Sequence, residues 1–154
     1  MGAVARVGVL VRDGYQELEF WYPLLRLREE GADVTVIGAG DRTYHSRLGY
    51  PVIPDITLAS ASDQLDAIVV PGASARDAVD ADTRQFLKRA HARGAIVAAT
   101  SEGPRALAEA GILQGQTASS EGVSVDGSVI TARSADDLPA FFRALDAALQ
   151  RKVQ

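Results

Sequence analysis

The chain alternates between short apolar segments and longer segments that are apolar on one face. The short segments have the composition of strands in a parallel sheet that is covered on both faces. They are Val4–Val11, 32–40, 65–73 and 95–100. The longer segments have apolar positions at helical spacing. They are Glu17–Glu30, Ala81–Arg93, 106–113 and, approximately, Asp136–Leu149. This alternation predicts an α/β three-layer sandwich with a mainly parallel central sheet and right-handed crossovers.

Two segments depart from this alternation and predict local antiparallel structure. The segment 41–54, DRTYHSRLGYPVIP, has the composition of a hairpin or a loop excursion. Residues Val123–Ile130 alternate between apolar and polar positions around Asp126-Gly127. An Asp-Gly pair between two such strands indicates a type I′ hairpin turn.

The first predicted helix has features that concern packing and assembly. We expect Pro23 to kink this helix or to mark a restart within it. Trp21 and Tyr22 are expected in the core or at a dimer interface, and we therefore predict a homodimer. The helix is expected to bury one apolar stripe, which consists of Leu18, Trp21, Leu24, Leu25 and Leu27.

The composition narrows the classes of function. The chain has 154 residues, 47% of them hydrophobic, and a formal charge of -4, which predicts one soluble domain over 1–154. It has no apolar run of the roughly 18 residues that a membrane span needs and no signal-peptide pattern, so we expect a cytoplasmic protein. Scattered arginines without a basic cluster argue against nucleic acid as a partner. Without cysteine and with only two histidines, we expect no metal and no cofactor.

The segment VAATSEGP, residues 97–104, joins a predicted strand to a predicted helix through a sharp turn. In an open α/β sheet, ligands bind beyond the carboxyl ends of the strands. A strand-to-helix elbow holds one side chain in a strained and exposed position. Here that side chain is Ser101, with the carboxyl group of Glu102 beside it. The loops DGYQELE and PGASA, which follow the first and third strands, end at the same edge of the sheet.

Four blocks of the sequence together resemble the DJ-one/ThiJ/PfpI superfamily over essentially the whole chain. They are GVLVRDGYQELEFWYPLLRLREEGADVTVIG, DAIVVPGA, VAATSEGPRALAEAGILQGQTASS and VDGSVITARS. The resemblance implies a flavodoxin-like sandwich, a homodimer and a nucleophile elbow of the form Ala-Ile-Cys-His-Gly-Pro. Aligned on Gly103 and Pro104, the reactive cysteine of the superfamily falls on Ser101 and the histidine after it falls on Glu102.

The resemblance also implies roles for the other strand-end loops. The acidic residue that approaches the cysteine sulfur falls on Glu19, and the Pro-Gly-Gly turn whose N–H groups face the pocket falls on 71–73. This chain lacks a segment of about fifteen residues after the elbow helix, which implies a more open pocket or one walled by a second subunit. Without the cysteine, the usual glyoxalase III, peptidase-like, isonitrile hydratase and redox-sensing activities do not carry over.

The leading hypothesis is a cofactor-independent enzyme that moves protons on a small carbonyl-containing or otherwise activated substrate. It would be a lyase, hydratase, isomerase or cyclase, and a biosynthetic pathway would be one setting for it. Glu19 would act as the general acid or base, because partial burial among apolar neighbours adapts a carboxyl group to proton transfer. Glu102 would be its partner, since two carboxyl groups in one small cavity repel each other and take different roles.

The remaining candidates would bind the substrate. Ser101 and three backbone N–H groups would stabilise negative charge that develops on a substrate oxygen. These N–H groups belong to Gly72, Ala73 and Glu102. His45, after the second strand, is a candidate pocket residue. Arg133, after the last strand, could bind a substrate carboxylate or phenolate, or pair with a nearby aspartate.

Two other functions stay open at this point. The chain could bind a small molecule or a protein without catalysis. Alternatively, Ser101 could be the nucleophile of a hydrolase, which requires a base within hydrogen-bond reach of the hydroxyl. Neither His45 nor His91 is well placed for that task, because His91 lies in a predicted helix far from the strand ends.

Overall fold

The computed structural model describes residues 3–62, 64–74, 79–101, 103–112 and 122–153. Seven strands of these residues form one sheet in the order β5-β2-β1-β6-β7-β9-β8, and all neighbours are parallel except β8 and β9. The strands are β1 (Arg6–Val11), β2 (Asp33–Gly38), β5 (Ile56–Thr57), β6 (Ala67–Val70), β7 (Ile96–Thr100), β8 (Val123–Asp126) and β9 (Val129–Ala132). Apart from the short edge strand β5, the parallel strands follow the flavodoxin-like order 2-1-3-4-5.

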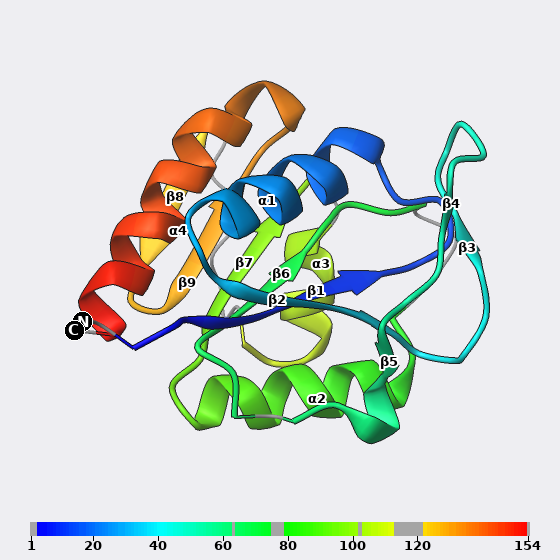
Figure 1. Ribbon diagram of the computed structural model, residues 1–154, viewed down its shortest axis with the longest axis horizontal. Coiled ribbons are helices and arrows are strands. Elements are labelled where there is room, and N and C mark those ends of the chain that lie inside the picture. Colours follow the sequence, from blue (N-terminus) through cyan, green and yellow to red (C-terminus); the bar gives the residue numbers. More distant parts are fainter. Residues whose placement is uncertain (1–2, 63, 75–78, 102, 113–121, 154) are drawn as a thin grey trace.

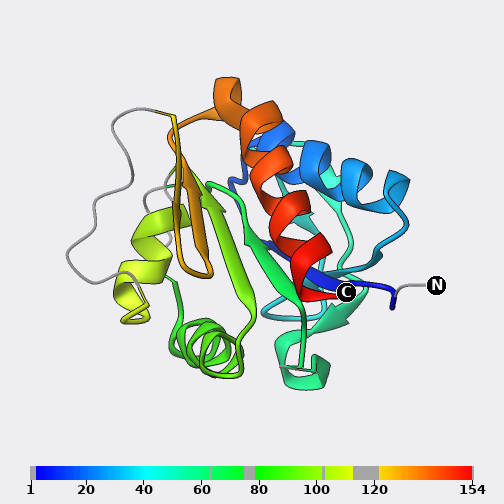
Figure 2. The same cartoon turned by 90° about the vertical axis from the view of Figure 1, so that its left-hand side faces the viewer.

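Helices cover both faces of this sheet, so the predicted three-layer α/β sandwich is confirmed (Figures 1 and 2). Helices α1 (Glu17–Glu29) and α4 (Leu138–Lys152) lie side by side on one face. Helices α2 (Ala81–Ala92) and α3 (Gly103–Glu109) cover the other. Two 3₁₀ turns, η1 (Leu58–Ser60) and η2 (Ala135–Asp137), complete the connections.

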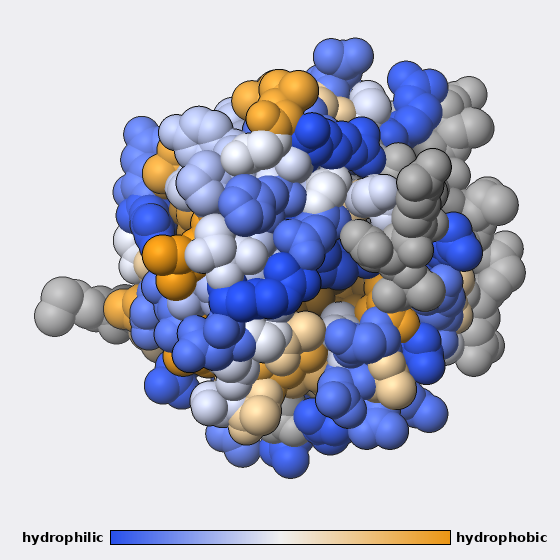
Figure 3. Space-filling model, turned by 90° about the vertical axis from the view of Figure 1, so that its right-hand side faces the viewer, coloured by the Kyte–Doolittle hydropathy of each residue, from blue (hydrophilic) through white to orange (hydrophobic). Residues whose placement is uncertain are grey.

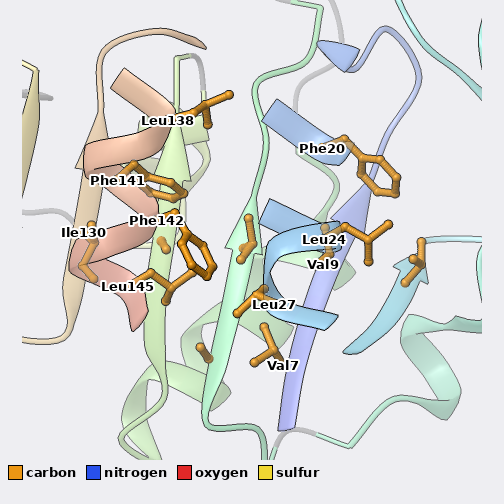
Figure 4. Packing of buried hydrophobic residues seen from close by; sticks show 14 of the residues in the cluster. Val7, Val9, Phe20, Leu24, Leu27, Ile130, Leu138, Phe141, Phe142 and Leu145 are labelled. Atoms are coloured by element: carbon orange, nitrogen blue, oxygen red, sulfur yellow. The ribbon is translucent and has the colours of Figure 1, made fainter. Parts of the chain in front are cut away.

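The sheet separates two apolar cores. The larger core joins α1 and α4 to one face of the sheet, and Figure 4 shows side chains of β1, β9 and the two helices between the helices and the sheet. Those labelled there are Val7, Val9, Phe20, Leu24, Leu27, Ile130, Leu138, Phe141, Phe142 and Leu145. The second core joins the opposite face to α2 and α3 through residues such as Ile68, Phe86 and Leu107. Each large apolar side chain that is fully buried contributes about 1.5–3 kcal/mol of transfer free energy.

Helix α1 buries Leu24 and Leu27 of the predicted stripe, but the rest of its buried face differs from the prediction. The buried residues are Glu19, Phe20, Pro23, Leu24 and Leu27. Leu18 and Leu25 of the predicted stripe are instead 57% and 56% exposed. The helix has two apolar stripes, and the stripe centred on Phe20 and Leu24 packs on the sheet. The helix is continuous through Pro23, so the predicted restart is wrong.

The two antiparallel segments form as hairpins, but one turn differs from its prediction. Strands β3 (Tyr44–His45) and β4 (Pro51–Val52) form the hairpin expected in 41–54. Between β8 and β9, Asp126 pairs with Val129, so the turn residues are Gly127 and Ser128. Only Gly127 has positive φ, at 59°. A type I′ turn needs positive φ at both central residues, whereas a type II′ turn needs it at the first alone. The predicted type I′ turn is therefore wrong.

An exposed apolar surface extends from α1 to the β3–β4 hairpin. Its α1 part is the second stripe, which contains Leu18, half-buried Trp21 and Leu25. The exposed apolar residues of the hairpin segment are Leu48, Tyr50 and Ile53. The rings of Trp21 and Tyr50 lie 6.2 Å apart and join the two parts into what we term the α1–hairpin surface. Figure 3 shows separate apolar areas among hydrophilic side chains on the hairpin side of the molecule. Within the described ranges, no helix has both the length and the apolar character needed to cross a membrane.

We expect two copies of the chain to associate through the α1–hairpin surface, because exposed apolar residues gathered on one side of a molecule mark interaction sites. Light scattering at micromolar concentrations should give the mass of a dimer. The variant Leu18→Glu/Leu25→Glu should give the mass of a monomer, while Val125→Glu, at an exposed position of β8, should leave the dimer intact. A monomeric parent chain across this concentration range would contradict the prediction.

Candidate active site

The candidate site lies where the carboxyl ends of β1, β6 and β7 meet. Strand β1 leads through a short loop into α1, β6 leads into Pro71–Ser74, and β7 ends directly before Ser101. Strands β1 and β6 are neighbours, although the chain visits β2 and β5 between them. This is the point where the direction of strand addition reverses, and ligand crevices of open α/β sheets lie there.

Ser101 is on a strained elbow, as the sequence predicts. Its φ is 50°, and it is the only residue other than glycine with positive φ among the described residues. Its N–H donates to the carbonyl oxygen of Ala132 at 3.0 Å, which ties the elbow to β9. Two residues later, a Cβ on Gly103 would lie 2.4 Å from the carbonyl oxygen of Val70, so only glycine allows α3 to begin this close to β6. Strain of this kind persists where the surroundings hold it in place.

The side chain of Ser101 points to Glu19, the acidic residue that the sequence identifies. The Ser101 hydroxyl donates to Glu19 Oε2 at 2.8 Å, and the Gly72 N–H donates to Glu19 Oε1 at 3.3 Å. The carbonyl oxygen of Arg133 lies 3.5 Å from Ser101 Oγ, a weaker alternative acceptor for the same hydroxyl proton. Glu19 is only 2% exposed, whereas Ser101 is half-buried. The structure therefore brings Glu19, Ser101 and Gly72 together in one hydrogen-bonded group.

The position of Glu19 depends on how α1 begins. Gln16 is the N-cap residue, and its side-chain oxygen accepts the Glu19 N–H at 2.8 Å. The Gln16 N–H donates to the carbonyl oxygen of Gly72 at 3.0 Å. The first turn of α1 and the Gly72 peptide unit thus bind each other through Gln16 and through Glu19. Gln16 is a site residue that sequence analysis missed, because an N-terminal cap gives no sign of its tertiary partner.

Glu19 is a buried acid that is held by neutral donors. Among the described residues, no lysine, arginine or histidine forms an ion pair with it. A buried carboxylate without a cation depends on hydrogen bonds to offset the loss of water. It receives two here, from a hydroxyl and from a backbone N–H. Both donors to Glu19 are therefore uncharged groups from the ends of other strands.

The turn after β6 is built differently from the prediction. The Gly72 N–H, expected to face a substrate oxygen, donates to Glu19 instead, so it belongs to the support of the acid. The Ala73 N–H has no acceptor among the described residues, although Ala73 is 2% exposed. Ala73 therefore remains the candidate backbone donor of this turn.

The other predicted residues have less direct relations to the site. His45 is exposed on β3, and no hydrogen bond between described residues joins its imidazole to Glu19 or Ser101. Arg133 is exposed, and its relation to the site is the carbonyl oxygen that lies near Ser101 Oγ. Glu102 lies outside the described residues, so its predicted partnership with Glu19 stays a prediction. Within the described ranges, no three His, Cys, Asp or Glu side chains cluster in a way that could hold a metal ion.

Two carboxylates, one in the β1–α1 loop and one at the start of α1, bind the segment that contains the β3–β4 hairpin beside the site. The Arg42 guanidinium donates to Asp13 at 2.7 Å and lowers the pKa of that carboxyl group. A hydrogen bond from the Ser46 side chain lowers the pKa of Glu17, which also accepts the Leu48 N–H at 2.8 Å. Both carboxyl groups are thus stabilised in their charged forms by the folded structure.

Comparison with known proteins assigns the family. The model of the DJ-1/PfpI family matches residues 5–121, a range that contains Glu19, Gly72 and Ser101. The chain belongs to the DJ-1/PfpI family. The superfamily resemblance and the fold predicted from sequence are thereby confirmed.

Relatives within the DJ-1/PfpI family include proteins named as enzymes. The chain is 32% identical over 166 residues to an uncharacterized protein of Archaeoglobus fulgidus, covering 95% of this chain and 99% of the relative. It is 30% identical over 158 residues to a protein of Thermococcus kodakarensis named a deglycase, covering 90% and 95%.

Among solved structures, a two-domain protein of Anabaena variabilis contains a DJ-1/ThiJ/PfpI-like domain and a ferritin-like domain. It is 28% identical, with a TM-score of 0.89 over 95% of this chain. The chain spans 48% of that two-domain protein. A cysteine-to-alanine mutant of a Salmonella typhimurium DJ-1 superfamily protein has a TM-score of 0.83 at 24% identity, covering 97% of this chain and 96% of its own, and supports the fold alone.

The lowered pKa values of Asp13 and Glu17 predict a loss of stability in acid. The ordinary values are 3.8 and 4.5, and the unfolded chain therefore takes up protons before the folded protein as the pH falls. The stabilisation is complete above about pH 4.5 and is lost as the pH falls through the lowered values. Because both groups are partly exposed, we expect a total effect on the order of 1 kcal/mol.

Urea unfolding between about pH 6 and pH 3 measures this effect. The variant Asp13→Asn/Glu17→Gln should lose less free energy of unfolding over this range than the parent chain. An equally steep decline in both proteins would contradict the prediction.

Proposed function

We propose that this DJ-1/PfpI family member is a cofactor-independent enzyme that transfers protons on a small carbonyl-containing or otherwise activated substrate. The reaction would be that of a lyase, hydratase, isomerase or cyclase. The observation that carries the proposal is the buried carboxyl group of Glu19, which accepts a 2.8 Å hydrogen bond from the half-buried hydroxyl of Ser101. Relatives named deglycases support an enzymatic role more generally.

The pair provides a route for a proton between the substrate and a buried acid. When a substrate C–H or O–H bond breaks, its proton passes to Ser101 Oγ while the hydroxyl proton of Ser101 passes to Glu19 Oε2. The electron pair of the broken bond stays on the substrate and shifts toward its carbonyl oxygen. For an isomerisation, Ser101 then gives its proton to another substrate atom, which binds it with the shifted electron pair, while Glu19 returns a proton to Oγ. For an elimination, the bond to the leaving group breaks, its electron pair departs with that group, and the group takes the proton from Ser101. Both sequences leave the enzyme unchanged.

The same arrangement can stabilise the negative charge that this step creates. The Ala73 N–H is a backbone donor in the turn after the carboxyl end of β6, and it has no acceptor among the described residues. A fixed donor directed at a developing oxyanion typically contributes a factor of about 10²–10³ to kcat. Ala73 would supply this interaction, and Gly72 would keep Glu19 in position.

Exchange of substrate protons with solvent tests the proposal directly. The protein is incubated in D₂O with small aldehydes, ketones and hydroxyketones. A glycated amino acid is added to this panel because relatives are named deglycases. Proton NMR should show loss of a substrate C–H signal, or formation of a product, for at least one compound. The absence of exchange and turnover across the panel, with binding retained, would overturn the proposal in favour of a non-catalytic binding protein.

We expect Glu19→Gln to reduce turnover by about 10²-fold or more, the usual scale for loss of a general acid or base. The amide keeps the shape of the side chain and can still accept from Gly72, but it cannot take up the proton. The folded state is checked by circular dichroism and the thermal midpoint. As a control, Glu109→Gln alters an exposed acid that pairs with Arg105 at 3.1 Å and should leave turnover unchanged. Near-normal turnover in Glu19→Gln would show that Glu19 does not carry the proton.

Ser101→Ala should reduce turnover less than Glu19→Gln. Removal of Oγ leaves a space next to Glu19 in which a water molecule can transmit the proton. Steady-state kinetics of the two variants on the same substrate compare the losses. Complete loss of activity in Ser101→Ala beside an active Glu19→Gln would reverse the assignment.

A second candidate is hydrolysis with Ser101 as the nucleophile, and the same hydrogen bond favours it. Glu19 lies within reach to accept the hydroxyl proton as Oγ attacks an ester or amide carbonyl. Incubation with an activated ester followed by mass spectrometry decides between the two. An acyl group on Ser101 that disappears with time would support hydrolysis, and its absence during turnover would support proton transfer.

A further inference from the structure

Arg47 lies outside the group that contains Glu19 and Ser101, yet its side chain connects the two loops that support Glu19. Arg47 follows β3 in the hairpin. Its Nε donates to the carbonyl oxygen of Gly14 at 3.3 Å, and its Nη2 donates to that of Ala73 at 3.4 Å. Its backbone N–H donates to the carbonyl oxygen of Tyr15 at 3.0 Å. One residue therefore binds the loop before α1 and the turn after β6.

These two loops determine the surroundings of Glu19. Gly14 and Tyr15 directly precede Gln16, the cap of α1, whose side chain holds the Glu19 N–H. Ala73 directly follows Gly72, whose N–H donates to the Glu19 carboxylate. A shift of the turn relative to α1 would lengthen that 3.3 Å contact first, because it is already longer than a typical N–H···O bond.

The two loops also lie close together. Gly14 has a φ of 75°, and a Cβ at this position would lie 2.7 Å from Ser74 Cβ and 3.1 Å from its backbone nitrogen. Glycine therefore allows the close approach that brings both loops within reach of Arg47. The guanidinium of Arg47 can connect them, because its donors are spread over a rigid plane and can bind two carbonyl oxygens at once.

Hydrogen bonds join the hairpin residues around Arg47 to the start of α1 and the loop before it. The Gly14 N–H donates to the carbonyl oxygen of His45 at 2.8 Å, and the Tyr15 hydroxyl donates to that of Tyr50 at 2.9 Å. The Leu48 N–H donates to Glu17 at 2.8 Å. Residues on both sides of Arg47 are thus fixed to the β1–α1 loop, while its guanidinium extends to the turn after β6.

We propose that Arg47 is a positioning residue, which holds the Gly72–Ala73 turn against α1 and thereby keeps the Gly72 N–H directed at Glu19. The hydrogen bonds of Arg47 to Gly14, Tyr15 and Ala73 lead to the loops and not to Ser101 or the Glu19 side chain, so it would act through the turn. The kinetic consequences rest on the proposed function, whereas the placement of the Gly72 N–H can be measured without any substrate.

The test compares Arg47→Met, Arg47→Lys and Arg28→Met by NMR and hydrogen exchange. Methionine keeps the length of the side chain without a donor, and lysine keeps the charge but loses the two-carbonyl geometry. Arg28 is an exposed arginine of α1 and serves as the matched control. Glu19→Gln identifies the Gly72 amide signal, which should move when its acceptor changes.

In Arg47→Met, the Gly72 amide signal should shift and its hydrogen exchange should rise by roughly tenfold or more, as for a local opening that spares the rest of the fold. Amides of Val97–Ala99 in β7 should keep their exchange rates. Arg47→Lys should fall between the parent and Arg47→Met, and Arg28→Met should match the parent. If Arg47→Met does not fold, the intermediate response of Arg47→Lys is the deciding measurement. An unchanged Gly72 amide would overturn the proposal.

On a substrate that Glu19→Gln fails to turn over, Arg47→Met should lower kcat by about tenfold with KM within about twofold, since small displacements of a catalytic group mainly affect the chemical step. Unchanged kcat on such a substrate would overturn the link between Arg47 and catalysis. If the Gly72 amide responds as expected but no substrate is turned over by the parent chain, the proposed function fails and the positioning role of Arg47 stands.

Discussion

Burial of the Glu19 carboxyl group requires that donors reach it from elsewhere in the chain, and this requirement organises the carboxyl edge of the sheet. Glu19 is 2% exposed and lies on the same face of α1 as Phe20 and Leu24, which pack on the sheet. An unpaired buried polar group costs about 1–3 kcal/mol, and more when it is charged. The donors come from the ends of β7 and β6, through Ser101 and Gly72. The register of α1 on the sheet is therefore coupled to the geometry of two other strand ends.

The elbow at Ser101 follows from the same requirement. A serine at φ 50° is unfavourable in isolation, yet this conformation directs Oγ to Glu19. The close approach of Gly103 to the carbonyl oxygen of Val70 brings the elbow next to the turn that contains Gly72. Thr100, the last residue of β7, has a fully buried hydroxyl without a partner among the described residues. The backbone at this strand end is thus arranged around one hydrogen bond, at a cost to local conformation and to a neighbouring hydroxyl.

Sequence patterns predicted the architecture well because it follows from alternation and burial. Apolar runs located the main parallel strands, whereas β5 was missed, since two residues give no periodicity. The face of α1 was predicted only in part, because the helix has two apolar stripes and periodicity does not decide which of them meets the sheet. The predicted stripe combined Leu24 and Leu27, which are buried, with Leu18 and Leu25, which are exposed.

The sequence located the elbow at Ser101, and the resemblance to the superfamily pointed to Glu19. The structure joins these two side chains at 2.8 Å, while their roles in catalysis stay predictions. Gly72 was assigned to the substrate, although its N–H supports Glu19, because the direction of one N–H depends on tertiary contacts. No sequence pattern pointed to Gln16 or Arg47. Each donates a hydrogen bond to a main-chain carbonyl oxygen that lies far away in the sequence, Gln16 to Gly72 and Arg47 to Ala73.

The choice of a hydroxyl beside Glu19 has a chemical consequence of its own. Serine stays protonated at neutral pH, so the Ser101 hydroxyl always carries one proton and two acceptor lone pairs. In the structure the Ser101 hydroxyl donates to Glu19 Oε2, which leaves the acceptor lone pairs of Oγ for another group. In the proposed reaction, Oγ would accept the substrate proton as its own proton moves to Oε2, and the direction of the hydrogen bond would reverse. Ser101 would thereby present an acceptor to the substrate before this transfer and a donor after it.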